Sequence, residues 1–199
     1  DKEKALLDDL RLLPGSVRAQ TATPPPRSAN PPVSVAMPNN AVREAFEAAA
    51  RGTLDDALLD SYSRHPLGGW LEYTALRKRM DTLPVQRGNG FLARHRGEPV
   101  ARAFRNDWLG ALAKRNEWQA FLANWNDDID DAGLRCLQLQ ARQSLGRMDA
   151  AWTSDAQALW RDNGKSLPSS CDAPFAQLAT QGGLDDGLRW ERFDKAVAE

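Results

Sequence analysis

The chain has 199 residues, of which 42% are hydrophobic and 27% charged, and its formal net charge is −1. This composition is typical of a folded protein. The small net charge excludes a strong electrostatic field that would attract nucleic acid or an anionic membrane. No apolar run reaches the roughly 18 residues of a transmembrane segment. The chain starts with Asp1 rather than Met, which indicates a processed or cut segment, so the absence of a targeting segment says little about its compartment.

The first 40 residues differ in kind from the rest. Residues 1–13 place four leucines on one helical stripe, which Pro14 and Gly15 end. Residues 17–40 hold six of the twelve prolines among Ser, Thr, Ala and Asn, a composition that favours extended chain. We therefore expect residues 1–40 to form a short helix followed by a proline-rich linker or strap. A docking site for a proline-recognising partner is the alternative.

Residues 41–199 have apolar residues at helical spacing, in segments separated by Gly, Pro and Asn. No long stretch alternates like a strand, so the predicted fold class is all-α. We expect Thr53 and Thr82 to cap helices, Gly88 and Gly90 to interrupt one, and Asp130 or Asp131 to cap another. The predicted helices cover residues 41–51, 54–64, 67–80, 83–95, 100–115, 117–125, 132–145, 149–161, 173–180 and 184–197.

A short signature recurs along these helices. A turn residue is followed five residues later by a small residue that opens a new apolar stripe. The turn residues are Gly52, Arg115, Gly146 and Gly182, separated by 63, 31 and 36 residues. Since 63 is about twice 31.5, the spacing indicates a two-helix repeat of the helical-solenoid kind, with TPR-like repeats of about 31–36 residues. Such a helix pair buries its apolar face only by stacking on its neighbours.

The residues that usually carry chemistry form no recognisable constellation. His65 and His95 lie beside helix-breaking residues, where helix-end or surface roles are expected, and the carboxylates lie at caps and on polar faces. The acidic run 126–133 lacks the glycine and the twelfth-position carboxylate of a calcium loop, and the glycines near residue 88 lack a phosphate loop's partners. We therefore expect no catalytic residue, no metal and no cofactor in this chain.

Two further residue types leave alternatives open. Cys136 and Cys171 are two reduced, buried thiols or one disulfide, and their spacing does not decide between them. The seven tryptophans fit the spacing of a helical core, although an aromatic platform for sugar is the alternative. They are Trp70, Trp108, Trp118, Trp125, Trp152, Trp160 and Trp190.

Three runs of the sequence resemble one enzyme family. They are HPLGGWLEYTALRKRM, FLARHRGEPVARAFRNDWLGALAKRNEWQAFLANW and CLQLQARQSLGRMDAAWTSDAQALWRDNGKSLPSSCDAPF. They resemble runs in the N-terminal superhelical, U-shaped domain of soluble lytic murein transglycosylases. The last run is the most specific, because it joins a cysteine, a Gly turn, Ala-Trp, Leu-Trp and Gly-Lys-Ser-x-Pro-x-x-Cys-Asp. The resemblance covers roughly residues 42–193.

The resemblance implies a fold, a disulfide and an activity. It implies that residues 41–199 form an α-superhelical U-shaped domain, and that Cys136 and Cys171 are paired, as the family pairs them. The family's periplasmic enzymes cleave peptidoglycan glycan strands to 1,6-anhydro-muropeptides, using one Glu of a separate lysozyme-like domain. That domain's Glu-Ser motif and Gly-Leu-Met-Gln run have no counterpart here.

Two functions follow from this reading. The first is a non-catalytic scaffold part of a periplasmic lytic transglycosylase, with peptidoglycan glycan strands and cell-wall proteins as partners and no nucleic acid. The second is a stand-alone helical repeat adaptor that binds a protein or peptide in its concave face.

Overall fold

The computed structural model describes residues 39–162 and 166–198, and every described element is a helix or a 3₁₀ turn. The all-α prediction is confirmed. The short helix expected over 1–13 and nearly all of the proline-rich stretch expected over 17–40 lie outside the described residues. The elements are α2 (Asn39–Arg51), α3 (Asp56–Ser61), α4 (Gly68–Arg77), η2 (Met80–Thr82), α5 (Val85–Arg94), α6 (Pro99–Lys114), α7 (Trp118–Ala123), α8 (Ala132–Ser144), α9 (Ala150–Asp162), η3 (Ser169–Cys171), α10 (Asp172–Thr180) and α11 (Asp186–Ala198).

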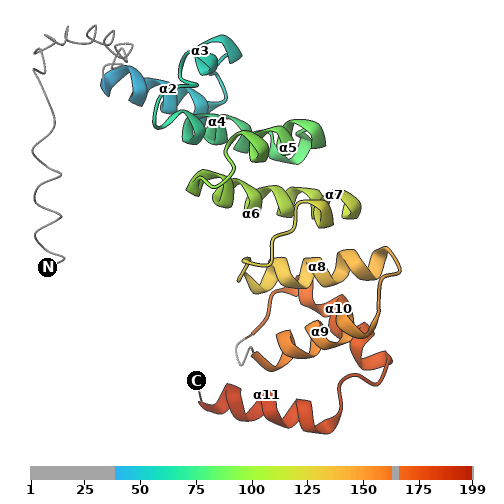
Figure 1. Ribbon diagram of the computed structural model, residues 1–199. Helices are drawn as coiled ribbons and strands as arrows, with labels where there is room; N and C mark the ends of the chain where they lie inside the picture. The colour runs from blue at the N-terminus through green and yellow to red at the C-terminus, as the bar shows by residue number, and fades with distance from the viewer. Residues whose placement is uncertain (1–38, 163–165, 199) are drawn as a thin grey trace, which may run out of the picture. The chain divides into compact units, whose positions relative to one another are not determined.

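The helices stack in chain order, each packing on near neighbours in the sequence (Figure 1). Helix α2 packs on α4, α4 and α5 on α6, α6 on α7 and α8, α8 on α9 and α10, and α9 on α11. This is the stacked-helix-pair solenoid that the repeated signature predicts, because each pair covers the apolar face of the next.

Three apolar clusters follow one another along the stack. The first joins α2 to α4 around Ala49 and Tyr62. The second and largest lies between α4 and α8 around Phe104 and Trp108. The third lies between α8 and the turn before α11, and it includes Trp152 and both cysteines. Burial is therefore distributed along the chain, as expected where each repeat contacts only its neighbours.

The recurring turns share one hydrogen-bond pattern. Gly52, Gly146 and Gly182 have positive φ angles of 78°, 70° and 75°. In each case the glycine N–H bonds to the carbonyl three residues back, and the next N–H bonds to the carbonyl five residues back. This is the Schellman ending of a helix, which favours glycine. In the second repeat the residue with positive φ is Asn116, at 56°, rather than the predicted Arg115, because asparagine tolerates that conformation better.

An aspartate that caps the next helix lies three residues after each of these glycines. Asp55, Asp149 and Asp185 accept hydrogen bonds from the backbone N–H groups of Leu58, Trp152 and Leu188, at 2.6, 2.8 and 2.8 Å. The shared unit is therefore Gly-x-x-Asp, in which glycine ends one helix and aspartate caps the next.

Two predicted caps are wrong. Thr53 does not cap α3, because its N–H and hydroxyl both bond back to the Ala48 carbonyl and so belong to the end of α2. Thr82 lies in the 3₁₀ turn η2, where its hydroxyl bonds to the Arg79 carbonyl, and Pro84 precedes α5 in extended conformation. The predicted cap at Asp130 or Asp131 is confirmed, since Asp131 accepts the Leu134 N–H at 2.8 Å and caps α8.

The predicted interruption at Gly88 and Gly90 is also wrong. Helix α5 runs continuously through both glycines. At Gly88 the absence of a side chain admits the indole of Trp108 from α6. The glycine therefore serves close helix packing rather than a turn.

The tryptophans divide into buried and exposed groups. Trp108 and Trp152 are fully buried, and the Trp152 Nε1 donates to the Leu139 carbonyl at 2.9 Å. Trp70 on α4 and Trp190 on α11 are 37% and 62% exposed, so the expectation that all seven lie in a core is wrong for these two residues. The Trp190 indole contacts Phe193, which is also exposed, on a face that no described helix covers.

Candidate functional site

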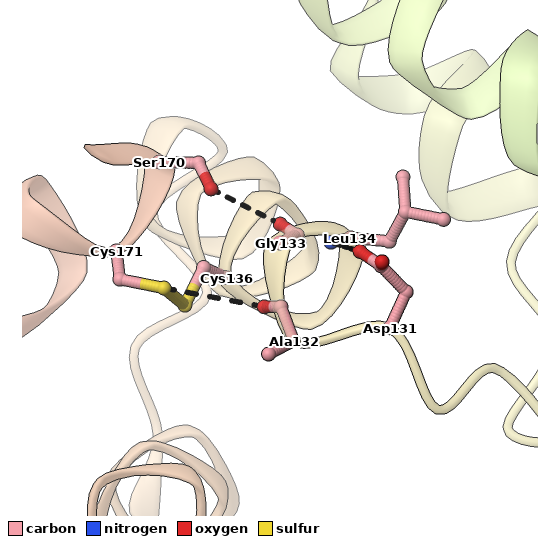
Figure 2. Close-up of a disulfide and its surroundings, with 7 residues drawn as sticks. All are labelled: Asp131, Ala132, Gly133, Leu134, Cys136, Ser170 and Cys171. Atoms are coloured by element: carbon pink, nitrogen blue, oxygen red, sulfur yellow. Dashed lines mark hydrogen bonds between the residues drawn. A yellow bond between two sulfur atoms is a disulfide. The ribbon is translucent and has the colours of Figure 1, made fainter. Parts of the chain in front are cut away.

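The two cysteines lie where the third apolar cluster begins. Cys136 is on α8, Cys171 ends the 3₁₀ turn η3, and the structure joins them by a disulfide of 1.97 Å with their Cα atoms 4.8 Å apart. Figure 2 shows that this bond and the Ser170 hydroxyl, which donates to the Gly133 carbonyl at 3.3 Å, fasten η3 to the start of α8. Both cysteines are buried. This disulfide joins residues 35 positions apart and holds α10 against α8, so its role is structural.

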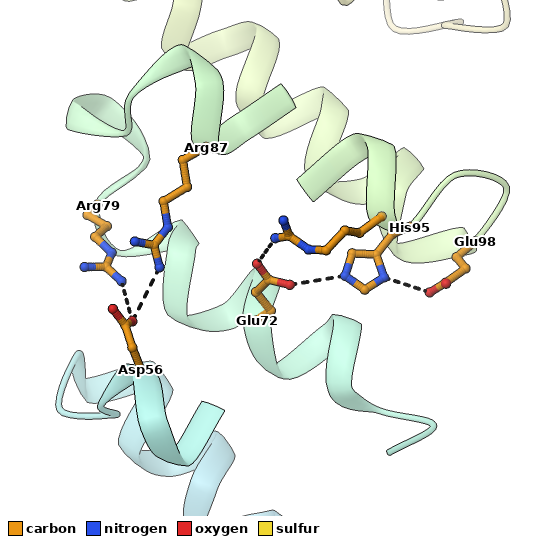
Figure 3. Close-up of polar contacts among 7 residues, drawn as sticks. Asp56, Glu72, Arg79, Arg87, His95 and Glu98 are labelled. Carbon is orange, nitrogen blue, oxygen red and sulfur yellow. Dashed lines mark hydrogen bonds and ion pairs between the residues drawn. The ribbon is translucent and has the colours of Figure 1, made fainter. Parts of the chain in front are cut away.

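A polar cluster joins three neighbouring elements in the first half of the chain (Figure 3). Glu72 on α4 accepts a hydrogen bond from the Arg94 guanidinium at the end of α5, and it also faces His95. The His95 Nε2 lies 3.2 Å from Glu72, and its Nδ1 lies 3.1 Å from Glu98, the residue before α6. The imidazole packs over Gly69, where an added Cβ would lie 2.9 Å from the ring.

This placement of His95 constrains its hydrogen atoms. A neutral imidazole has one N–H donor, while both nitrogens here face carboxylate oxygens. Both contacts are hydrogen bonds at once only when both ring nitrogens carry hydrogen. In that state His95 links Glu72 to Glu98 as a cation, and the cluster ties α4, α5 and the start of α6 together.

A second ion pair lies beside the first. Asp56, in the first turn of α3, is 3.4 Å from the Arg87 guanidinium and 3.6 Å from that of Arg79 (Figure 3). Asp56, Glu72 and His95 line one groove of about 770 Å³ between α3, α4 and α5. Asp56 and Glu72 are each paired with an arginine guanidinium from another element, so these contacts hold neighbouring helices together.

The structure places the predicted residues as follows. His95 follows α5 directly, and His65 lies between α3 and α4, where its Nδ1 accepts the Leu67 N–H at 3.1 Å, so both lie at helix ends as predicted. The sequence did not indicate the cluster around His95, because Glu72 lies 22 residues before Arg94 and 23 before His95. In the described ranges, 39–162 and 166–198, no three His, Cys, Asp or Glu residues are grouped to hold a metal ion. None of the described helices is both long and apolar enough to cross a bilayer.

Sequence relatives of the chain carry one name. No protein-family profile matches it. Over 142 residues, 71% of this chain, it is 27% identical to the soluble lytic murein transglycosylase of Salmonella typhimurium and 25% identical to that of Escherichia coli. The chain spans 22% of the length of each of these relatives.

Solved structures give the same result. A structure of an inactive mutant of the lytic transglycosylase Slt from Pseudomonas aeruginosa is 25% identical, with a TM-score of 0.67 over 78% of this chain. The complex of the 70-kDa soluble lytic transglycosylase with bulgecin A is 24% identical, with a TM-score of 0.68 over 77% of this chain, a likeness that shows the fold alone. Each match covers 25% of the other chain. In sequence and fold, most of this chain is therefore similar to about a quarter of a soluble lytic murein transglycosylase, as its three sequence runs indicate.

Proposed function

We propose that this chain is a non-catalytic scaffold part of a periplasmic lytic transglycosylase, an enzyme that cleaves peptidoglycan glycan strands and leaves 1,6-anhydro-muropeptides. The observation that carries the proposal is the combined match of sequence and fold over about three quarters of the chain. The match is to enzymes named for this activity, and it corresponds to only 22–25% of their length.

The distribution of polar groups in this chain supports a scaffold role. A glycosidic bond is cleaved by a carboxylic acid whose pKa is raised in an apolar pocket. Among the described residues, the Glu72 carboxylate accepts a hydrogen bond from Arg94 and lies 3.2 Å from His95, so polar groups rather than an apolar pocket surround it. The stacked helix pairs, which the disulfide fastens together at α8, form a framework that positions other parts of the enzyme.

The disulfide also bears on the compartment. Disulfides persist in oxidising compartments such as the bacterial periplasm. A Cys136–Cys171 bond in the native protein therefore agrees with the periplasmic location that we propose.

An assay on purified peptidoglycan tests the scaffold role. The 199-residue chain is incubated with isolated sacculi, and soluble products are analysed by mass spectrometry, with a known lytic transglycosylase as positive control. We expect the chain to release no 1,6-anhydro-muropeptides. Release of these products by the chain alone would contradict the proposal, since the catalytic residues would then lie within it.

A further inference from the structure

A second groove lies on a different part of the stack. It has a volume of about 770 Å³ and is lined by the end of α5, the start of α6 and the segment after α7. This volume falls in the range of small-molecule sites, and the lining combines apolar groups with polar side chains from several elements. Leu92, Ala101 and Ile129 supply apolar surface, while three arginines and four asparagines supply polar groups beside Trp125.

The groove has a net positive charge, because three arginines and two carboxylates line it. Arg96, Arg102 and Arg105 all line it, and none of the three takes part in an ion pair with any described residue. The two lining carboxylates are already engaged. Glu98 faces the His95 Nδ1 at 3.1 Å, and Asp128 accepts from the Asn126 amide at 3.4 Å.

One of these arginines has an unused buried donor. The Nε of Arg105 is hidden from solvent and has no hydrogen-bond partner. Because this atom is not open to the groove, Arg105 contacts a ligand only through the other atoms that line it. Guanidinium groups also match the planar geometry of a carboxylate, which accepts two parallel hydrogen bonds.

The remaining lining suits a sugar. The Trp125 ring is fixed by stacking on Phe121, with ring centroids 5.9 Å apart, and by its Nε1, which donates to Asp127 at 3.0 Å. A fixed indole offers an apolar surface to the C–H face of a pyranose. Next to it the Asn124 amide donates to the Asn89 Oδ1 at 2.9 Å and to the Ala120 carbonyl, which leaves the Asn124 Oδ1 as acceptor and the Asn89 amide as donor.

We propose that this groove binds a carboxylate-bearing stretch of an amino-sugar strand. The carboxylate lies against Arg96, Arg102 and Arg105, a sugar ring packs on Trp125, and hydroxyl or acetamido groups bond to Asn89 and Asn124. The identity of the strand as peptidoglycan rests on the proposed function, since muramyl residues carry lactyl or peptide carboxylates. The groove then gives the scaffold a direct role in holding substrate.

Calorimetric titration of the 199-residue chain tests the groove. The probes are soluble, uncross-linked glycan strands with free muramyl carboxylates, chitin oligosaccharides of equal length that lack carboxylates, and inorganic phosphate. We expect the glycan strands to bind about tenfold or more tightly than the chitin oligosaccharides, because only the former supply charge-assisted hydrogen bonds. Inorganic phosphate is expected to bind far more weakly, since it makes no contact with Trp125.

Paired variants locate the binding. The groove variant Arg96→Gln/Arg102→Gln is compared with Arg64→Gln/Arg147→Gln, which removes the same charge from exposed arginines outside the groove. Circular dichroism confirms that both variants are folded. We expect the groove variant to lose about tenfold or more in affinity for glycan strands and the control to keep wild-type affinity.

Three results would overturn the proposal. They are no binding of glycan strands to the chain, equal binding by the groove variant and the control, and phosphate binding as tight as that of the strands, which would indicate a general anion site. None of these bears on whether the complete gene product cleaves peptidoglycan, so the proposed function is decided separately by its own assay.

Discussion

Gly88 on α5 lies directly against the indole of Trp108 on α6. A Cβ added at Gly88 would lie 2.5 Å from the Cε2 and Cζ2 atoms of Trp108, closer than atoms can pack. Trp108 is fully buried and stacks on Phe104, whose ring centroid lies 4.2 Å from that of Phe91. The missing side chain at Gly88 therefore lets α5 and α6 approach closely at the centre of the largest apolar cluster.

A Gly88→Ala substitution should destabilise the protein despite alanine's higher helix propensity. Overpacking a filled core costs about 1–3 kcal/mol, and the rigid indole has little room to move. Urea unfolding measures the change in the free energy of unfolding. Gly110→Ala on α6 is the matched control, because no atom lies within 4 Å of its added Cβ, and we expect it to stabilise by about 0.5–1 kcal/mol. Equal stability of the two variants would show that the Gly88–Trp108 contact does not limit packing.

The ion-pair cluster gives a second stability prediction. Glu72 is only 17% exposed and contacts both Arg94 and His95. Glu72→Gln keeps the shape but loses the charge, and we expect a loss of about 1–3 kcal/mol in the free energy of unfolding, as for hydrogen bonds between charged groups.

The control for this prediction is Glu47→Gln on α2. Glu47 is 56% exposed and lies 3.9 and 3.8 Å from Arg43 and Arg51, so its pairs are screened by water. We expect a change of about 0.5 kcal/mol or less. If the two substitutions lower the free energy of unfolding equally, the cluster around His95 contributes no more to stability than a surface ion pair.

The disulfide gives a third prediction. Because it closes a loop between residues 35 positions apart, reduction should lower the free energy of unfolding by about 3–4 kcal/mol. A reducing agent should lower the melting temperature of the wild type and leave that of Cys136→Ala/Cys171→Ala unchanged. Protein isolated from its natural source is denatured without a reducing agent, and its free thiols are titrated. Two free thiols would refute the disulfide and with it the argument for an oxidising compartment.

The cap of α9 predicts a pH dependence. The pKa of Asp149 is lowered from 3.8, chiefly by the hydrogen bond from the Trp152 N–H; burial opposes this shift, and Arg142 adds to it. A lowered folded-state pKa stabilises the protein above the unfolded pKa, and this stability is lost as the pH falls through the folded pKa. The wild type should therefore exceed Asp149→Asn in melting temperature near neutral pH, and the difference should shrink below about pH 4. A difference that stays constant down to about pH 2 would contradict this role of the charge.

The sequence predicts the helices of this fold well, because their signals are local. Apolar spacing gives each described helix to within a few residues, and Asp131 and the turn glycines at 52, 146 and 182 mark real boundaries. Local signals gave a wrong prediction where two nearby residues, Thr53 and Asp55, were both suited to cap the same helix. Thr53 is a good cap by type, yet the Schellman bond from its N–H holds it in the preceding helix and leaves Asp55 to cap α3.

The remaining features depend on contacts between distant segments. Nothing near Gly88 in the sequence indicates that Trp108, twenty residues later, lies against it. The sequence therefore predicts a helix interruption at a glycine that in fact allows close helix packing. The His95 cluster and the arginine-lined groove each combine residues from three elements, and their geometry is set by how the helices stack. The Cys136–Cys171 pairing came from the family resemblance, since spacing alone left both states open.

The activity of the native gene product tests the central claim most directly. Antibodies raised against this chain would be used to purify that product from cells, and its digestion of sacculi would be followed by mass spectrometry. We predict release of 1,6-anhydro-muropeptides, and a marked loss of that activity when the segment corresponding to residues 41–199 is deleted from the gene. A purified native product that releases no anhydro-muropeptides would contradict the account and favour a repeat adaptor that binds a protein or peptide.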